Sequence, residues 1–385
     1  MGGLAAGLAC ARAGWQPRLL EQAAQFSEVG AGIQLGPNAT RLLHGWGLER
    51  GLAAVAAFPP QLRVRSATDG TQLGLMRLGA TFAQRYGAPY ATVHRADLQR
   101  LLLEGVRQAR VDLQLCSAVT GVRQLENEVL VRVNDGADVQ GDVLIGADGL
   151  WSAVRSKVFG DAPPAFTGHL AYRAVAVQRD LPALLRTADV TVWLGPRLHV
   201  VAYPLRGGDW LNVVAIVQGR SRGPAQDWHQ AAIAADLQTA MGRQCAPLQD
   251  LVRAMPAWRL WALHDRDPIA GAHEMVRGRV ALLGDAAHPM RPYFAQGAGM
   301  AIEDAAELGR ILAMAGSADI DVPAALRAYA DNRWERCAQV QARSRRNGRI
   351  FHATGPMRWG RDVSLRLLGE RLLDQPWLYE GPALA

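Results

Sequence analysis

The chain contains 385 residues, carries a formal net charge of +7 and is 49% hydrophobic. That length exceeds one compact core and allows two subdomains. No apolar run approaches the ~18 residues of a membrane-spanning helix, and no basic stretch followed by an apolar core marks a secretory signal. Arginine supplies nearly all of the positive charge, because Lys157 is the sole lysine, and this excludes a P-loop nucleotide site.

The arginines are spread along the chain, which does not favour a nucleic-acid partner. The densest group lies on a predicted C-terminal helix and indicates a solvated face or, alternatively, an anion-binding or partner surface. It comprises Arg333, Arg336, Arg343, Arg345, Arg346 and Arg349. The four cysteines form no CxxC pair, so we expect no disulfide framework, no metal site and a reducing cytoplasm. They are Cys10, Cys116, Cys245 and Cys337.

Helices and strands alternate through the first part of the chain. Hydrophobic periodicity and turn residues predict, in order, a helix over 4–13, a strand over 18–21, a glycine-rich loop over 29–37, a helix through 42–43, an amphipathic helix over 98–107, and strands over 128–133 and 142–145. Gly14 is the expected end of the first helix, because glycine commonly follows a helix C-terminus.

The pattern changes at about residue 169 to longer alternating runs, over 170–177, 190–194, 199–205 and 210–217. The tetrapeptide 206–209 joins the last two as an expected antiparallel hairpin. A buried strand over 279–283 and a long helix over 298–314 follow, and the remainder is mostly helical. We therefore predict an α/β fold with a discontinuous Rossmann-like dinucleotide-binding domain (1–70, 92–168 and 266–320), an inserted antiparallel sheet for the substrate (71–91 and 169–265) and a C-terminal helical region (321–385).

The first motif occupies the start of the chain. A complete G-x-G-x-x-G fingerprint follows a strand, and its glycines let backbone amides approach a pyrophosphate at a helix N-terminus. Here the strand and the first two glycines are absent, while Gly2, Gly3 and the helix are present. Glu21 lies 18 residues beyond Gly3, near the spacing expected for the ribose-binding acid, although a surface acid at a strand end is the simpler interpretation. Either Met1 is a misplaced start, which we favour, or this form binds the dinucleotide poorly.

Two further motifs follow predicted buried strands. The strand over 142–145 ends in Gly-Ala-Asp-Gly, which places Asp148 at a ligand edge or makes it a helix cap, with Arg155 close behind. The strand over 279–283 ends in Gly-Asp-Ala-Ala-His-Pro, so Asp285 can accept hydrogen bonds from a polyol. The segment over 292–300 then begins a helix whose N-terminal dipole stabilises a nearby anion, unless its small residues serve packing alone.

These three motifs, in this order and spacing, resemble class A FAD-dependent aromatic hydroxylases, a resemblance that covers nearly the whole chain. Within that family the chain is most similar to salicylate hydroxylase, 3-hydroxybenzoate 6-hydroxylase and 6-hydroxynicotinate monooxygenase. The resemblance implies that FAD is bound by Gly2, Gly3, Glu21, Arg95, Asp148, Arg155, Asp285, Gly297 and Ala298. It also implies a homodimer.

The resemblance places the substrate on the inserted sheet. His199 and Tyr203 share one face of a predicted strand, because side chains alternate, and the related enzymes carry a His/Tyr pair at this spacing. A buried pair that only satisfies neighbouring backbone groups is the alternative. Gln296 matches a glutamine near the substrate in some relatives and is otherwise a helix cap.

The implied activity is hydroxylation of a small phenolic or hydroxylated aromatic acid with NADH or NADPH and O₂, through a flavin C4a-hydroperoxide. Such an electrophilic donor requires an electron-rich ring, which deprotonation of a phenol by His199, with Tyr203 as relay, would supply. Two alternatives stay open. One is a non-catalytic relic or flavin-binding regulator, and the other is a hydroxylase of a larger quinone precursor or polyketide.

Overall fold

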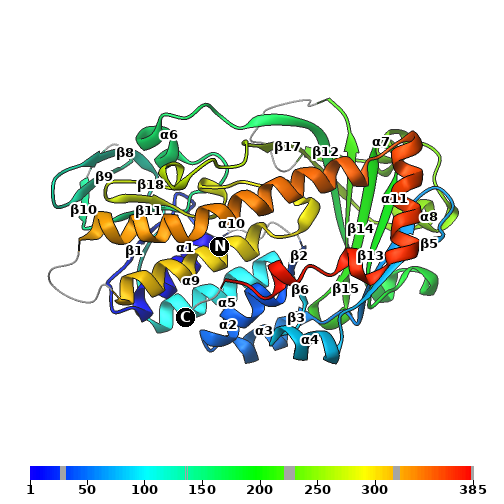
Figure 1. Cartoon of the computed structure of the whole chain (residues 1–385), viewed down its shortest axis with the longest axis horizontal. Coiled ribbons are helices and arrows are strands. Elements are labelled where there is room, and N and C mark those ends of the chain that lie inside the picture. Colours follow the sequence, from blue (N-terminus) through cyan, green and yellow to red (C-terminus); the bar gives the residue numbers. More distant parts are fainter. Residues whose placement is uncertain (27–31, 135, 137, 221–229, 315–320, 383–385) are drawn as a thin grey trace.

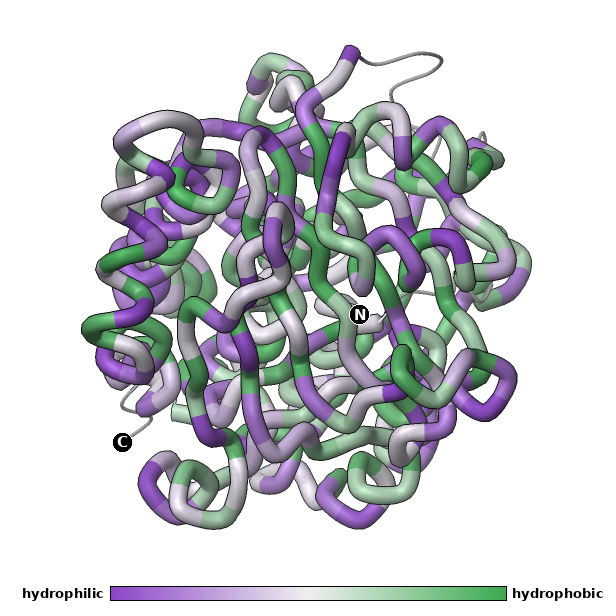
Figure 2. Tube along the Cα trace, turned by 90° about the vertical axis from the view of Figure 1, so that its right-hand side faces the viewer, coloured by the Kyte–Doolittle hydropathy of each residue, from purple (hydrophilic) through white to green (hydrophobic). Residues whose placement is uncertain are grey.

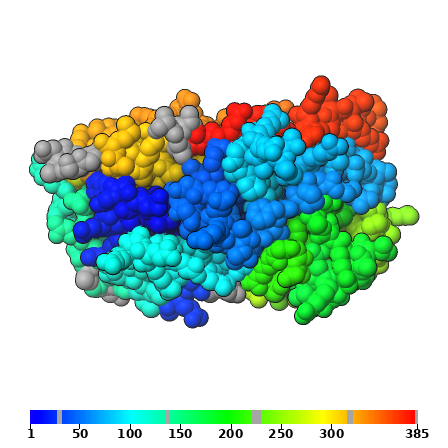
Figure 3. All heavy atoms as spheres, turned by 90° about the horizontal axis from the view of Figure 1, so that it is seen from below, coloured from blue at the N-terminus to red at the C-terminus, as the bar shows by residue number. Residues whose placement is uncertain are grey.

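The computed structural model describes residues 1–26, 32–134, 136, 138–220, 230–314 and 321–382. The molecule is elongated, with a helix-rich dinucleotide-binding part at one end and a large sheet at the other (Figure 1). Seen from below, the N-terminal third covers one end and the middle, and residues of the large sheet cover the other end (Figure 3). This arrangement confirms the predicted α/β class with an inserted antiparallel sheet.

The dinucleotide-binding part holds four small sheets. The first pairs β1 (Arg18–Leu20) with β7 (Asp112–Gln114) in parallel, and the second pairs β11 (Leu144–Gly146) in parallel with β19 (Val280–Leu282), which also pairs with β18 (Val276–Arg277). The third is the meander of β8 (Val119–Gln124), β9 (Val129–Val133) and β10 (Asp138–Gly141). The fourth contains β2 (Gly32–Leu35), β6 (Ala91–His94) and β3 (Ala56–Ala57). Residues 32–35 were predicted as loop, and that prediction is wrong: Gly32 pairs with His94 and Leu35 with Ala91. Residues 29–31 of the same prediction lie outside the described part.

The large sheet has eight strands. In spatial order they are β16 (Gln230–Ala232), β17 (Trp258–Asp265), β12 (Ala165–Val177), β15 (Trp210–Gln218), β14 (Leu198–Leu205), β13 (Val190–Gly195), β4 (Gln61–Ser66) and β5 (Gln72–Arg77). The predicted β14–β15 hairpin is confirmed, and Gly207 and Gly208 at its turn have φ angles of +68° and +107°, which glycine adopts without steric cost. The predicted domain boundary at residue 70 divides the β4–β5 hairpin, both strands of which belong to this sheet.

Helices cover the sheets and fill the space between the two parts of the molecule. They are α1 (Gly2–Arg12), α2 (Pro37–Gly45), α3 (Glu49–Val55), α4 (Ala80–Tyr86), α5 (Arg95–Gln108), α6 (Ala153–Phe159), α7 (Ala234–Met241), α8 (Ala246–Ala254), α9 (Gly297–Met314), α10 (Val322–Phe351), α11 (Gly355–Leu368), α12 (Glu370–Leu373) and α13 (Pro376–Tyr379). Helix α10 runs from the dinucleotide-binding part to the sheet, and α11 lies against the outer end of the sheet (Figure 1). Among the described helices, none is both long and apolar enough to cross a bilayer.

Both faces of the large sheet are buried, which explains its nearly continuous apolar strands. One face carries Val200, Ala202 and Val213 and packs beneath α7 and α8. The other carries Tyr203 and Ile216 and meets the dinucleotide-binding part. Figure 2, which views the sheet end, shows hydrophilic residues gathered in the outer turns and helices.

Close packing of glycine and alanine brings α1 against α9. A Cβ atom added to Gly309 would lie 2.9 Å from the Cβ of Ala9 and 3.1 Å from its carbonyl oxygen. A side chain at position 309 would therefore push the two helices apart. Gly7 similarly lies under Leu19 of β1. The small-residue pattern of α1 thus determines how closely the first helix sits on the core.

A buried ion network, which we call the α9–α10 clamp, joins α9 to α10. Arg333 donates to Asp304 at 2.8 Å and to Glu303 at 2.9 Å, and Arg336 donates to Glu303 at 2.7 Å. Arg333, Glu303 and Asp304 are each 0% exposed. The prediction of a solvated arginine face is therefore wrong for Arg333, because two acids on another helix, 29 and 30 residues earlier in the sequence, pair with it.

The clamp also holds the loop after β19. His288 lies 2.5 Å from Asp304, and the same carboxylate accepts the backbone N–H of Gly284 at 2.9 Å. Burial opposes a charge on His288, but Asp304 raises the pKa of His288 well above its ordinary value. Burial likewise opposes ionisation of Asp304, but His288 and Arg333 hold the pKa of Asp304 below its ordinary value. Cys337 lies beside these groups, so a His, an Asp and a Cys converge here, with the carboxylate already engaged by Arg333.

We expect Arg333→Met to lower the free energy of unfolding by roughly 3–5 kcal/mol, because it removes the one cation shared by two fully buried carboxylates and leaves their charge only partly compensated. Arg253→Met is the matched control, since Arg253 pairs with Asp250 at the surface and its loss should cost about 0.5 kcal/mol or less. Urea unfolding monitored by circular dichroism measures both. Equal effects of the two substitutions would contradict a structural role for the clamp.

Candidate functional site

The three sequence motifs converge at the carboxyl ends of β1, β11 and β19. A Cβ atom on Gly2 would lie 2.8 Å from Leu283, and one on Gly3 would lie 3.6 Å from Ala147. Gly297, at the start of α9, is 3.8 Å by the same measure from the Oδ1 atom of Asp285. Segments nearly 300 residues apart therefore border one edge, which in open α/β folds is where dinucleotides bind. We call this edge, formed by Gly2, Gly3, Ala147, Asp285 and Gly297, the cofactor edge.

A pocket of about 180 Å³ opens beside this edge. Glu21, at the end of β1, and Arg95, at the start of α5, both line it. The amino group of Met1 lies within electrostatic reach of Arg95, Glu21 and Asp285. Asp285 is exposed, yet the surrounding protein raises the pKa of its carboxyl through desolvation, and the charge of Arg95 opposes that shift. Glu21 and Arg95 thus line one recess, and Asp285 lies within electrostatic reach of Arg95.

Asp148 and Arg155 have partners within the protein. The carboxylate of Asp148 accepts the hydroxyl of Ser152 at 2.5 Å and the backbone N–H of Val154 at 3.0 Å, so it caps α6. Arg155 is 3% exposed and donates to the carbonyl oxygens of Ala286 and Ala287 at 3.2 and 2.7 Å. Arg155 therefore supports the loop after β19 from below, and Asp148 follows the simpler capping interpretation.

Gln296 directly precedes α9, and its side chain contacts Asn38 of α2. Its side-chain oxygen accepts the amide of Asn38 at 3.1 Å, and its backbone carbonyl accepts the N–H of Met300. Ala295, just before it, has a φ angle of +51°, which sharply redirects the chain into the helix. This turn brings Gly297 and Ala298 to the edge beside Asp285, with the positive end of the helix dipole behind them.

His199 lies at the centre of a buried group of rings. Its Nδ1 atom is 2.8 Å from the Nε2 atom of His352, and its ring centroid is 5.2 Å from that of Tyr293 and 5.3 Å from that of Phe351. His169 completes the group at 4.9 Å from His352. Burial, followed by the charge of His169, lowers the pKa of His199 to about 3. Burial, followed by the charge of His199, lowers the pKa of His352 to about 2.

Tyr203 is on the same face of β14 as His199, as predicted, but farther along the strand. The rise of about 3.3 Å per residue separates their Cα atoms by roughly 13 Å. Tyr203 packs on the backbone of Gly32, where an added Cβ would lie 2.7 Å from the hydroxyl oxygen. Burial raises the pKa of Tyr203 above its ordinary value, although nearby Arg173 opposes the shift. The two side chains therefore flank a stretch of sheet without contacting each other.

Sequence reasoning did not single out Tyr293, His352 or Arg173. Tyr293 lies in the quoted segment over 292–300, but no local pattern shows that its ring faces His199. His352 ends α10, more than 150 residues from its partner. Arg173 could have been found from the sequence, because it is a charged residue at an inward-facing position of the otherwise apolar predicted strand over 170–177. The hydroxyl of Tyr293 and the Nδ1 atom of His352 are buried, and neither has a hydrogen-bond partner among the described residues.

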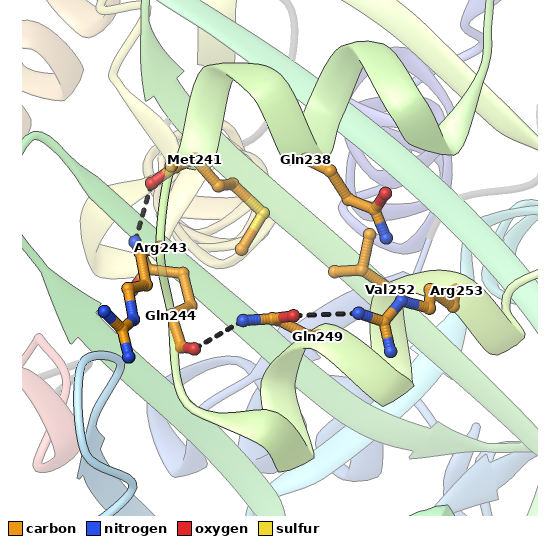
Figure 4. Close-up of a pocket in the computed structure, with 8 residues that line it drawn as sticks. Gln238, Met241, Arg243, Gln244, Gln249, Val252 and Arg253 are labelled. Carbon is orange, nitrogen blue, oxygen red and sulfur yellow. Dashed lines mark hydrogen bonds between the residues drawn. The ribbon is translucent and has the colours of Figure 1, made fainter.

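A larger pocket of about 320 Å³ lies far from this site, between α7 and α8 (Figure 4). Its polar side chains bond to one another: Gln249 donates to the carbonyl of Gln244 at 2.6 Å and accepts from Arg253 at 2.8 Å. It lies beyond the face of the sheet opposite His199 and Tyr203, and it holds none of the predicted site residues. We therefore assign it no part in the chemistry.

Comparison with known proteins agrees with the geometry. A family model described as an FAD binding domain matches residues 1–344. The 3-hydroxybenzoate 6-hydroxylase of Polaromonas naphthalenivorans is 39% identical over 382 residues, which cover 98% of this chain and 93% of that protein. The 6-hydroxynicotinate 3-monooxygenase of Bordetella bronchiseptica is 36% identical over 349 residues, which cover 90% and 89%.

Solved structures give the same result. Klebsiella pneumoniae HpxO, complexed with FAD and uric acid, superposes with a TM-score of 0.84 at 26% identity, covering 97% of this chain and 92% of that one. A salicylate hydroxylase substrate complex superposes with a TM-score of 0.81 at 26% identity, covering 100% and 97%. The chain therefore belongs to the FAD-binding-domain family and is a class A FAD-dependent aromatic monooxygenase.

Proposed function

We propose that this enzyme hydroxylates a small hydroxylated aromatic acid, using NADH or NADPH and O₂. The observation that carries the proposal is the buried His199–His352 pair, because it places an uncharged imidazole on the sheet face that borders the cofactor edge. The names of the hydroxybenzoate and hydroxynicotinate enzymes among the relatives support the substrate class. Bound FAD, reduced by the nicotinamide and combined with O₂, supplies an electrophilic oxygen atom.

The residues at the edge fit the cofactor, and we assign them roles accordingly. Gly2 and Gly3 allow close backbone approach at the start of α1, where the helix dipole favours a pyrophosphate. Glu21 accepts ribose hydroxyls and Asp285 accepts ribitol hydroxyls. Arg95 and the backbone of Gly297 and Ala298 adjoin the isoalloxazine, and Gln296 supports this turn through Asn38. These side chains bind and orient, and they need no proton transfer of their own.

We assign His199 the removal of the ring hydroxyl's proton. At neutral pH its lowered pKa keeps the imidazole uncharged and able to accept that proton. A phenolate formed beside it then stabilises the imidazolium, because an opposite charge favours the protonated form. The electron-rich ring that results is the form that an electrophilic oxygen atom attacks. Tyr203 holds the other side of the ring or relays its proton.

His352 is a positioning residue in this scheme. In this scheme the Nδ1 atom of His199 carries the proton and donates it in a hydrogen bond to the Nε2 atom of His352. The other ring nitrogen of His199, Nε2, is then unprotonated and is the acceptor that faces the substrate. Because His352 ends α10, the C-terminal helices help to determine which nitrogen of His199 can act as base. Phe351 and Tyr293 exclude water from the pair.

Replacement of the two acids near the cofactor should separate binding from capping. We expect Glu21→Ala to raise the Kd for FAD about tenfold or more, with little loss of stability. We expect Asp148→Ala to cost about 1 kcal/mol of unfolding free energy through the lost cap, with the Kd for FAD changed less than threefold. Quenching of FAD fluorescence and thermal unfolding measure the two quantities, and a reversed pattern would overturn both assignments.

Removal of the base should uncouple the reaction. We expect His199→Asn to lower product formation by ~100-fold or more, while substrate-stimulated NAD(P)H oxidation continues and releases H₂O₂. His352→Leu should lower product formation about tenfold and shift its pH profile, and His352→Gln should restore part of it, because an amide can still accept the Nδ1 proton. Product and peroxide are quantified together by chromatography and a peroxidase assay. An unchanged product yield in His199→Asn would refute the assigned role.

The same histidine should make the fold sensitive to acid. Because the pKa of His199 is lowered to about 3, the unfolded state binds more protons between about pH 3 and pH 6.5, and stability falls as pH decreases through that window. For this one group the free energy of unfolding falls by about 2 kcal/mol between pH 7 and pH 5. His199→Asn should reduce the pH dependence by that amount, whereas His273→Asn, at an exposed position, should leave it as in the parent protein. Urea unfolding at several pH values provides the comparison.

A further inference from the structure

Arg173 is a buried arginine without an acid. It is 7% exposed, on the inward face of β12, and within the described part of the chain it donates no hydrogen bond and pairs with no carboxylate. Its described contact is with the ring of Trp261, with the guanidinium 5.2 Å from the ring centroid. A cation removed from water needs more compensation than one aromatic face gives. The other buried arginines described above, Arg155 and Arg333, do have carboxylate or carbonyl partners.

Its neighbours make the surroundings more positive. Burial, followed by the charges of Arg95 and Arg259, lowers the pKa of Arg173 to about 10. Arg259 lies directly opposite Arg173 on β17, and Arg95 comes from the cofactor edge. Two further cations beside a buried one are unfavourable unless an anion joins them. The guanidinium of Arg173 is therefore a buried positive charge, between the sheet and the cofactor edge, that no carboxylate in the described part of the chain offsets.

The register of the sheet relates Arg173 to the proposed base and relay. Arg173 is opposite Val214 on β15, and Val214 is opposite Val201 on β14, midway between His199 and Tyr203. All of these residues share one face. Two strand spacings, about 10 Å, separate β12 from β14, a gap that a long arginine and one aromatic ring can bridge. The unpartnered side-chain nitrogen of Asn212, beside Tyr203, offers a donor within the same area.

We propose that Arg173 binds the carboxylate of the aromatic acid and thereby orients its ring hydroxyl toward His199. The inference rests on the proposed function and deepens it, since it names the residue that makes the enzyme select an acid. Arginine suits this role because its planar fork binds a carboxylate through two parallel hydrogen bonds. The second possible anion at this place is the reduced isoalloxazine, and the experiment distinguishes the two.

The test measures binding of ring acids and their neutral carboxamides to the FAD-loaded enzyme, by the change in flavin absorbance. The probes are 2-, 3- and 4-hydroxybenzoate, 6-hydroxynicotinate and the matching carboxamides. We expect the parent enzyme to prefer the acid, and Arg173→Gln to raise the Kd for the acid on the order of 30-fold or more while that for the carboxamide changes less than threefold. The Kd of Arg173→Lys for the acid should lie between that of the parent enzyme and that of Arg173→Gln. Arg253→Gln, at a surface position on the opposite side of the large sheet, is the matched control and should keep the preference.

Other outcomes would overturn the proposal. Equal weakening of acid and carboxamide in Arg173→Gln would mean that Arg173 supports the fold, and a lowered Tm would accompany it. A retained acid preference together with a more negative midpoint potential of the bound flavin would assign Arg173 to the cofactor instead. A parent enzyme that binds these rings without preferring the acid would refute the carboxylate site alone. One that binds none of the probes would refute the proposed function as well.

Discussion

The α9–α10 clamp is the interaction on which the rest of the site depends. Glu303 and Asp304 sit side by side on α9 and are shared among Arg333, Arg336, His288 and Asn38. Because both carboxylates, Arg333 and His288 are buried and engaged, the loss of one of them leaves charge that is no longer fully compensated, so the network is strongly cooperative. Through it the loop after β19, the start of α9 and α2 hold fixed positions relative to α10. The clamp thus joins the cofactor edge and the C-terminal helices into one rigid unit.

That unit extends to the large sheet through α10. The helix that supplies Arg333 to the clamp ends at His352, which contacts His199 on β14. A single rigid helix therefore couples the loop that borders the cofactor to the side chain assigned as base. Tyr293 strengthens the connection, because its ring packs on Gly348 of the same helix and faces His199. This geometry explains why a C-terminal region without a motif of its own matters to the site.

The cofactor edge and the face of the large sheet that carries His199 and Tyr203 differ in charge and polarity. The cofactor edge brings Arg95 together with the acids Glu21 and Asp285, whereas the sheet face offers uncharged histidines, tyrosines and a guanidinium that pairs with no described carboxylate. Desolvation keeps the histidines neutral and Tyr203 protonated, so the proposed proton transfer begins from the required forms. Within the described part of the chain no carboxylate pairs with Arg173, which lies on the sheet face that carries His199 and Tyr203.

The sequence by itself determined the class of fold, the inserted sheet with its β14–β15 hairpin and the family, because these depend on periodicity, turn residues and glycine-rich segments that are local in the chain. It also placed His199 and Tyr203 on one face, since a strand alternates regardless of context. Only the tertiary structure decided that Asp148 caps a helix, that Arg333 is buried, that residues 32–35 form a strand, and that His352 and Arg173 adjoin the site. Each of these outcomes depends on partners that are distant in the sequence, from 29 residues for Arg333 and Asp304 to 153 for His199 and His352, or on competition between capping and ligand binding. Neither has a signature in a short stretch of sequence.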